Sequence, residues 1–307
     1  MHRALSVSRV TPWGLLGLLI LAQICYPLTS GDTRAAFTVA TVVLGYLLSV
    51  SHAYFTRGPR TALALVGTAT LGGFAVEALG VATSFPFGTY DYSGQLGPKV
   101  LGVPLIIPLA WTWMAWPAWL AAQRLPLTRW ARVAVAAFGL AAWDVFLDPQ
   151  MVAEGYWRWV SPTPALPGIP GIPISNYLGW LGFAVVLMTA LDYLVRKNAP
   201  VRKNAPVRKN APVRKIASAK IVDVAVQPSQ TPAHHGETAE DTTRCQAGDT
   251  GLSTGDDVPI IVLWIWTYAS SVLAHAVFLD LPASAVWGGV LMGAAVLPLL
   301  PHLRRRP

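Results

Sequence analysis

Three acidic residues stand inside long apolar runs of this 307-residue chain, namely Glu77, Asp144 and Asp148. Ionisable groups within membrane-spanning segments are costly and rare, so each of them is a functional candidate. Asp144 and Asp148 are four residues apart, which places them on one face of a helix, and Glu77 could complete a carboxylate cluster with them. In a crowded, partly desolvated cluster, one carboxyl group can keep its proton at neutral pH and act as a general acid.

Two of these acids also have a purely structural interpretation. Asp148 precedes Pro149 and could only end a helix, whereas Glu77 could pair with Lys99 or Arg158. The sequence leaves both interpretations open, and catalytic roles for the three acids are a hypothesis.

A polar stretch, residues 85–111, interrupts the apolar sequence eight residues after Glu77. It contains Tyr90, Asp91 and Tyr92 between several Gly and Pro residues. We expect it to cover the site as a lid and to contact the substrate, with Asp91 secondary to the carboxylates.

Four further residues are candidates for substrate binding. Trp111 ends the polar stretch and Trp143 precedes Asp144, so both could line a slot for a long apolar ligand, and aromatic faces also stabilise cations. An interfacial aromatic belt is the favoured explanation for most of the aromatic residues, including Trp111, Trp113, Trp116 and Trp119. The other two candidates are Asn176 and His275, although a packed, hydrogen-bonded histidine is the favoured interpretation of the latter.

Composition predicts the elements that must position these residues. The chain is 53% hydrophobic and only 12% charged, with a mean hydropathy of +0.46, whereas soluble proteins are about 25% charged. Its apolar blocks are long enough to cross a hydrocarbon core of about 30 Å as helices. We therefore predict an all-α fold, a polytopic integral membrane helical bundle with about eight transmembrane helices. The expected spans are residues 11–29, 35–54, 61–82, 103–122, 130–147, 173–194, 259–279 and 283–301, and the first is expected to be a retained helix rather than a cleaved signal peptide.

The basic residues predict the orientation of the bundle. With eight spans, 20 of the 23 Lys and Arg residues fall on one side, and only Arg34, Lys99 and Arg158 fall on the other. Cytoplasmic loops carry the positive excess, so the N and C termini are predicted to be cytoplasmic in a multi-pass protein of the cell (plasma) membrane. The outer ends of the spans then bring Glu77, Asp144, Asp148, Asn176 and His275 to one membrane depth. This convergence is the main functional signal, and the distribution of the net charge of +8 argues against a nucleic-acid partner.

Three parts of the chain are predicted from these patterns. Residues 1–195 form a membrane domain with six spans and the candidate site, and residues 259–307 add two spans and a basic tail. Residues 196–258 form a basic linker with Val-Arg-Lys-Asn-Ala-Pro repeats that start at Val195, and this segment lacks the apolar residues needed for a packed core. Its basic residues could rest on anionic lipid.

Sequence motifs for cofactors were also considered. We find no P-loop, dinucleotide-binding glycine motif or zinc-protease motif, and Cys25 and Cys245 do not suggest a metal site. No cofactor and no metal are therefore expected, which argues against a nucleotide-driven pump, a flavoenzyme or a zinc protease.

Several motifs resemble a known family. They are Glu77-Ala-Leu-Gly80, Phe85-Pro-Phe-Gly-Thr-Tyr-Asp-Tyr92, Trp143-Asp144, Leu147-Asp-Pro-Gln-Met151, Trp157-Arg-Trp159 and Gly171-Ile-Pro-Ile-Ser-Asn176. Over roughly residues 40–195, and loosely over the last two spans, the chain resembles the membrane-embedded carotenoid biosynthesis family. That family includes CruF-type carotenoid 1,2-hydratases and bisanhydrobacterioruberin hydratases.

The resemblance implies a carotenoid 1,2-hydratase, a hydro-lyase. Its substrate would be an acyclic carotenoid, lycopene-like or a C50 derivative, and its reaction the acid-catalysed hydration of the terminal C1=C2 double bond of a ψ end group to a tertiary alcohol. Under this hypothesis Asp144 is the acid, and Glu77 or Asp148 positions water. Membrane lipid and other enzymes of carotenoid biosynthesis are candidate partners. Two alternatives stay open, a non-catalytic carotenoid- or lipid-binding or transport protein and a carotenoid end-group cyclase or isomerase.

Overall fold

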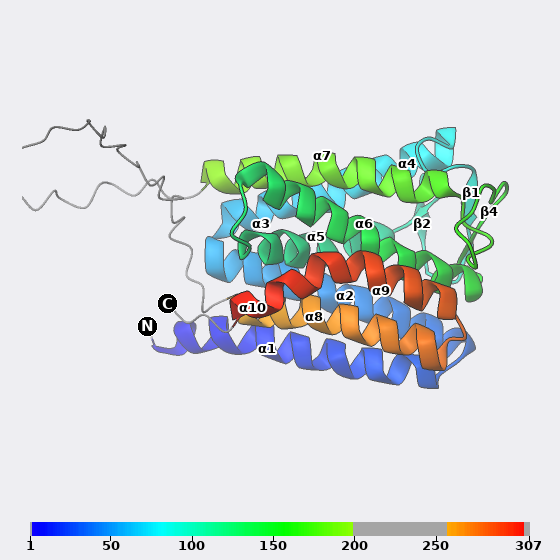
Figure 1. The fold of residues 1–307 in the computed structure, drawn as a ribbon. Coiled ribbons are helices and arrows are strands. Elements are labelled where there is room, and N and C mark those ends of the chain that lie inside the picture. Colours follow the sequence, from blue (N-terminus) through cyan, green and yellow to red (C-terminus); the bar gives the residue numbers. More distant parts are fainter. Residues whose placement is uncertain (1, 199–256, 304–307) are drawn as a thin grey trace, which may run out of the picture. The chain divides into compact units, whose positions relative to one another are not determined.

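The structure is a computed structural model that describes residues 2–198 and 257–303. Its helical segments run antiparallel, and the turns at one end of the bundle carry four short strands (Figure 1). The helices are α1 (His2–Cys25), η1 (Tyr26–Leu28), α2 (Gly31–Arg57), α3 (Pro59–Leu65), η2 (Val66–Leu71), α4 (Gly72–Thr83), α5 (Ile107–Gln123), α6 (Arg129–Ala153), α7 (Ile174–Asn198), α8 (Val258–Leu273), η3 (Ala274–Phe278), α9 (Pro282–Val296), η4 (Leu297–Leu299) and α10 (Leu300–Leu303). The strands are β1 (Tyr90–Tyr92), β2 (Lys99–Val100), β3 (Val103–Pro104) and β4 (Trp157–Trp159).

The predicted all-α membrane bundle is confirmed. In the described part of the chain, seven helical segments are long and apolar enough to cross a membrane. They correspond to the expected spans except for the fourth, which was expected at residues 103–122. There the helix α5 begins only at Ile107 and has 17 residues, which is about 26 Å at 1.5 Å per residue. It starts late because Val103 and Pro104 form strand β3 instead of a first helical turn.

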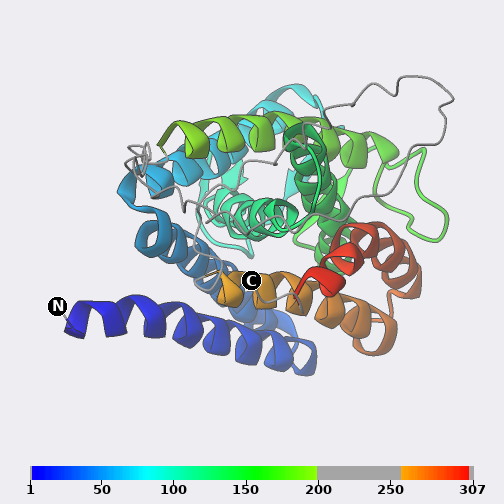
Figure 2. The ribbon, with the colours of Figure 1, turned by 60° about the vertical axis from the view of Figure 1, so that its left-hand side comes forward.

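The short helix α5 lies in the middle of the bundle (Figure 2). It packs against α2, α4, α6, α7 and α8, and 14 of its 17 residues are buried. Its tryptophans Trp111, Trp113, Trp116 and Trp119 are at most 4% exposed. The interfacial-belt explanation was therefore wrong for these four residues, which belong to the core.

Ion pairs hold the helices together at the end of the bundle away from the strands. Asp192 of α7 is buried and pairs with Arg129 of α6 (2.7 Å) and with Arg196 (2.9 Å). Asp257, which precedes α8, pairs with Arg57 of α2 (2.8 Å). Because buried charges are tolerated only when they are paired, these contacts fix the relative positions of α2, α6, α7 and α8.

The small sheets lie at the opposite end of the bundle. Strands β1 and β4 pair in antiparallel register, with Tyr90 opposite Trp159 and Tyr92 opposite Trp157, and β2 pairs with β3. The polar stretch of residues 85–111 is therefore partly strand and is joined to the segment that follows α6.

Several sequence predictions concern residues that lie outside the described part of the chain. They are the disordered linker with its repeats, most of residues 196–258, and the basic tail at residues 304–306. They also include Cys245.

Candidate active site

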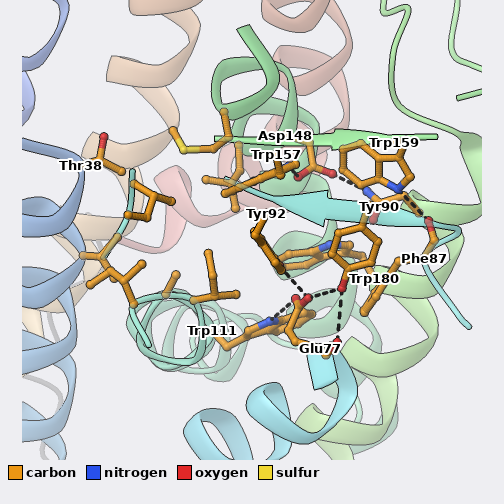
Figure 3. Close-up of a pocket in the computed structure, with 18 residues that line it drawn as sticks. Thr38, Glu77, Phe87, Tyr90, Tyr92, Trp111, Asp148, Trp157, Trp159 and Trp180 are labelled. Atoms are coloured by element: carbon orange, nitrogen blue, oxygen red, sulfur yellow. Dashed lines mark hydrogen bonds between the residues drawn. The ribbon is translucent and has the colours of Figure 1, made fainter. Parts of the chain in front are cut away.

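A cavity opens beneath the β1–β4 sheet (Figure 3). Its volume is about 590 Å³, including the part open to the surroundings. Water occupies about 30 Å³ per molecule in the liquid, so the cavity has room for water. The lining includes two of the candidate acids together with candidate binding residues and aromatic residues, namely Glu77, Asp148, Asn176, Tyr90, Tyr92, Trp111, Phe87, Trp157, Trp159 and Trp180.

Glu77 is held in this cavity by three hydrogen-bond donors. Its Oε2 accepts from the hydroxyl groups of Tyr90 (2.7 Å) and Tyr92 (2.8 Å), and its Oε1 accepts from Nε1 of Trp111 (3.0 Å). An indole N–H can only donate, and a carboxylate can only accept. With all three groups donating, these contacts stabilise the carboxylate form of Glu77 against the cost of its burial. The alternative interpretation, a pairing of Glu77 with Lys99 or Arg158, was wrong.

Two glycines of α4 make this arrangement sterically possible. Gly73 and Gly80 lie four residues before and three residues after Glu77, so they share its helix face. A Cβ atom at Gly73 would lie 2.8 Å from the Trp111 side chain, and one at Gly80 would lie 2.8 Å from the Tyr90 hydroxyl oxygen. Only glycine leaves room for both donors to reach the carboxylate.

The other two acids form a second polar cluster with Asn176 at the start of α7. Asp144 and Asp148 lie on the same face of α6 and are buried. The side-chain amide of Asn176 donates to Oδ2 of Asp144 (2.9 Å) and to Oδ2 of Asp148. The two carboxyl groups therefore share one amide nitrogen and lie close together. Two carboxylates that share a site repel each other when both are ionised, which favours one retained proton between them.

Asp148 also contacts the sheet. Its Oδ1 accepts a hydrogen bond from Nε1 of Trp157 in β4 (3.1 Å). Helix α6 continues to Ala153, so the interpretation of Asp148-Pro149 as the end of a helix was wrong. Asp148 lines the cavity, whereas Asp144 lies behind it and does not.

Strands β1 and β4 form the aromatic wall of the cavity. Successive side chains of a strand point to opposite faces, so Tyr90, Tyr92, Trp157 and Trp159 share the inner face. Tyr92 packs edge-on against Trp157, with ring centroids 5.5 Å apart. In Figure 3 the two tyrosines lie between Glu77 and Asp148.

The hydroxyl groups of this wall are held in their neutral form. Burial, followed by the negative charge of Glu77, raises the pKa of Tyr90 and of Tyr92 well above the ordinary value. Both groups therefore remain hydrogen-bond donors to Glu77 throughout the neutral pH range.

A stacked tryptophan pair forms the opposite wall. The rings of Trp111 and Trp180 lie 3.8 Å apart with 13° between their planes, and Phe183 packs edge-on against Trp111 at 5.1 Å. Aromatic faces of this kind suit an apolar chain and a developing positive charge.

Besides Asp144, three candidate residues do not line this cavity. Asp91 is exposed on the outer face of β1, directly opposite Arg158. Trp143 lines a neighbouring cavity. His275 is buried in η3, where its Nδ1 contacts the hydroxyl of Ser284 (2.9 Å).

Sequence reasoning missed a direct role for three aromatic residues that line the cavity, Trp157, Trp159 and Trp180. The available signal was the alternation of aromatic and charged residues in Tyr90-Asp-Tyr92 and Trp157-Arg-Trp159, which is typical of two strands that share one buried face. No comparable pattern marks Trp180, which reaches the cavity from the second turn of α7.

The chain is similar to proteins of a known family. The chain matches the family described as "carotenoid biosynthesis protein" over residues 37–229. The chain belongs to this carotenoid biosynthesis family. The matched residues include every element that lines the cavity, from α2 to the first half of α7.

One relative in the comparisons has a named activity. A bisanhydrobacterioruberin hydratase from Haloarcula japonica is 34% identical over 139 residues, which are 44% of this chain and 45% of the relative. The chain thus spans about half the length of that relative. No solved structure matches the chain.

Proposed function

We propose that this carotenoid biosynthesis family member is a carotenoid hydratase. It adds water across the terminal C1=C2 double bond of an acyclic ψ end group and releases a tertiary alcohol. The observation that carries the proposal is the pair of unlike carboxylate sites in one aromatic cavity. Glu77 accepts hydrogen bonds from three neighbours, whereas Asp148 belongs to a carboxyl pair that shares one amide donor, which favours one retained proton. The named activity of the Haloarcula japonica relative supports the same reaction class.

The first step is protonation of the alkene. The Asp144–Asp148 pair supplies the proton, and Asp148 delivers it to C2 because Asp148 is the member that faces the cavity. The π electrons of the double bond form the new C2–H bond and leave a tertiary cation at C1. The stacked rings of Trp111 and Trp180 stabilise that cation through their faces.

The second step is the attack of water on C1. The oxygen forms the C1–O bond, and the excess proton of the attacking water passes to the Glu77 carboxylate. Tyr90, Tyr92 and Trp111 orient that carboxylate. Return of the proton from Glu77 to the aspartate pair restores the site, so the net change is the addition of one water and no redox step occurs. An acid and a base held in different environments can each contribute about 10²–10⁴-fold to the rate.

The rest of the molecule supports an orientation in the cell membrane. The ion-paired end that carries Arg57, Arg124, Arg129 and Arg196 would face the cytoplasm, and the cavity would face outward. The carotenoid polyene would remain among lipid tails while its end group enters the cavity.

The decisive experiment is expression in a lycopene-producing bacterium followed by mass analysis of the pigments. A product heavier by one water supports the hydratase. Unchanged mass with an altered spectrum indicates a cyclase or isomerase, and unchanged pigment indicates a binding or transport protein. Asp148→Asn should abolish hydration, because an amide cannot donate an acidic proton, and a fully active variant would refute the proton route.

A further inference from the structure

A second cavity lies beside the candidate active site. Its volume is about 700 Å³, including the part open to the surroundings, and its lining comes from α1, η1, α2, α5, α6, α8 and η3. Four lining residues are common to both cavities, so the two share a wall made by Thr38, Val42, Leu147 and Met151.

Besides Oη of Tyr26, three buried polar atoms of this lining have no hydrogen-bond partner among the described residues. They are Oγ1 of Thr41, Nε1 of Trp113 and Oγ1 of Thr267, and the residues are 8%, 4% and 1% exposed. They come from three different helices, α2, α5 and α8. The lining of the second cavity therefore contains unpaired hydrogen-bonding atoms from several different helices.

The two threonines differ from others in the same bundle. A helical threonine usually satisfies its hydroxyl by donating to the carbonyl four residues earlier. Thr38 donates to Arg34 (3.0 Å), Thr68 to Ala64 (2.8 Å) and Thr189 to Val185 (2.7 Å) in this way. Thr41 and Thr267 do not, which leaves their hydroxyl groups available to an occupant of the cavity.

The chemistry of the lining identifies the occupant. The lining contains no charged side chain, so it offers nothing to an ion. The indole N–H of Trp113 requires an acceptor, and each threonine hydroxyl can both donate and accept. Water meets all three requirements at once, and at about 30 Å³ per molecule in the liquid several molecules fit within the cavity.

We propose that the second cavity is an internal water chamber that supplies the water consumed in the neighbouring active site. This inference rests on the proposed hydration. Each turnover removes one water from a site that is largely walled by aromatic side chains. The chamber provides a replacement across the wall that the two cavities share.

Hydroxyl-radical footprinting of the purified full-length protein tests the chamber without using catalysis. Radicals produced by radiolysis of internal water oxidise the nearest side chains. Trp143 lines the chamber and should be oxidised much faster than Trp119, which is equally inaccessible from outside but lies away from both cavities. Equal oxidation of Trp143 and Trp119 would overturn the proposal.

A double substitution links the chamber to the reaction. Thr41→Val with Thr267→Val keeps the side-chain shape but removes both hydroxyl groups. We expect Trp143 oxidation to fall to the level of Trp119 and kcat to fall while KM for the carotenoid stays unchanged. Thr189→Val, which removes a hydroxyl that is paired within its own helix, is the matched control and should change neither readout.

The outcomes separate the two proposals. Rapid Trp143 oxidation in a protein that hydrates no carotenoid would refute the proposed function and keep the chamber. Full hydration activity in the double variant would refute the supply role of the chamber and leave the proposed function in place.

Discussion

Replacement of Glu77 by glutamine tests the central role assigned to the carboxylate. The glutamine side chain has the same shape and can keep all three neighbours. Its oxygen can accept from Nε1 of Trp111, and its amide can donate to the oxygens of Tyr90 and Tyr92, whose hydroxyl hydrogens are free to rotate. Glu77→Gln should therefore fold normally and lose only the negative charge and the capacity to accept a proton.

The expected magnitudes follow from that difference. Loss of a general base reduces kcat by about 10²–10⁴-fold, which corresponds to about 3–5 kcal/mol in activation free energy. Glu77→Ala would also leave three buried donors without an acceptor, at about 1–3 kcal/mol each. The alanine variant should therefore be several kcal/mol less stable, whereas the thermal midpoint of the glutamine variant should remain close to that of the native protein.

The assay is conversion of an acyclic carotenoid by membranes that contain equal amounts of each variant, with thermal unfolding of the purified proteins in detergent. Glu154→Gln is the matched control, since Glu154 lies at the same end of the bundle, pairs with Arg34 and is outside the cavity. It should keep native activity. If Glu77→Gln is folded and converts substrate at a rate similar to Glu154→Gln, the assignment of Glu77 as the base is refuted.

Three more predictions concern the neighbours of Glu77 and Asp148. Asn176→Ala should lower kcat by about 10-fold or more without unfolding the protein. The aspartate pair loses the amide donor, and a hydrogen bond to a charged group is worth about 1.5–3 kcal/mol. Unchanged kcat and an unchanged pH profile would contradict the positioning role of Asn176. Gly80→Ala should lower the stability by about 1–3 kcal/mol, because its Cβ would lie 2.8 Å from the Tyr90 hydroxyl oxygen, whereas Gly182→Ala, with nothing within 4 Å, should not lower the thermal midpoint. The raised pKa of Tyr90 and Tyr92 means that above about pH 10 the unfolded chain releases protons that the folded protein retains. The free energy of unfolding should therefore fall by about 1.4 kcal/mol per pH unit per tyrosine. Tyr90→Phe should make this alkaline loss of stability less steep in thermal unfolding from pH 8 to pH 11, and an unchanged slope would argue against burial as the cause.

Hydropathy was sufficient to predict the membrane bundle, because apolar blocks of this length have few other stable environments. It also placed Glu77, Asp148 and Asn176 at one depth, and these three residues do line one cavity. Helical periodicity alone placed Asp144 beside Asp148. The first success depends on how far along its own helix each residue lies, and the second on residue spacing within one helix.

The missed features depend on contacts between distant segments. The pairing of β1 with β4 joins residues almost 70 positions apart, and no local pattern specifies a partner at that separation. The burial of α5 was missed for a related reason, since hydropathy cannot distinguish a helix surrounded by lipid from one surrounded by other helices. The same limit explains why Trp116 and Trp119 were assigned to an interfacial belt although both are buried inside the bundle.

The central position of α5 has a consequence for biosynthesis. Its neighbours α6, α7 and α8 follow it in the chain, so α5 must enter the membrane before much of its final surroundings exists. Until α7 is present, the indole N–H of Trp119 lacks its acceptor, the Asp192 carboxylate. The last helices therefore complete the enclosure of α5, which carries Trp111 of the site. A chain that stopped at residue 198 would contain every residue that lines the first cavity, yet the helix at its centre would be left open to lipid along the face that α8 covers.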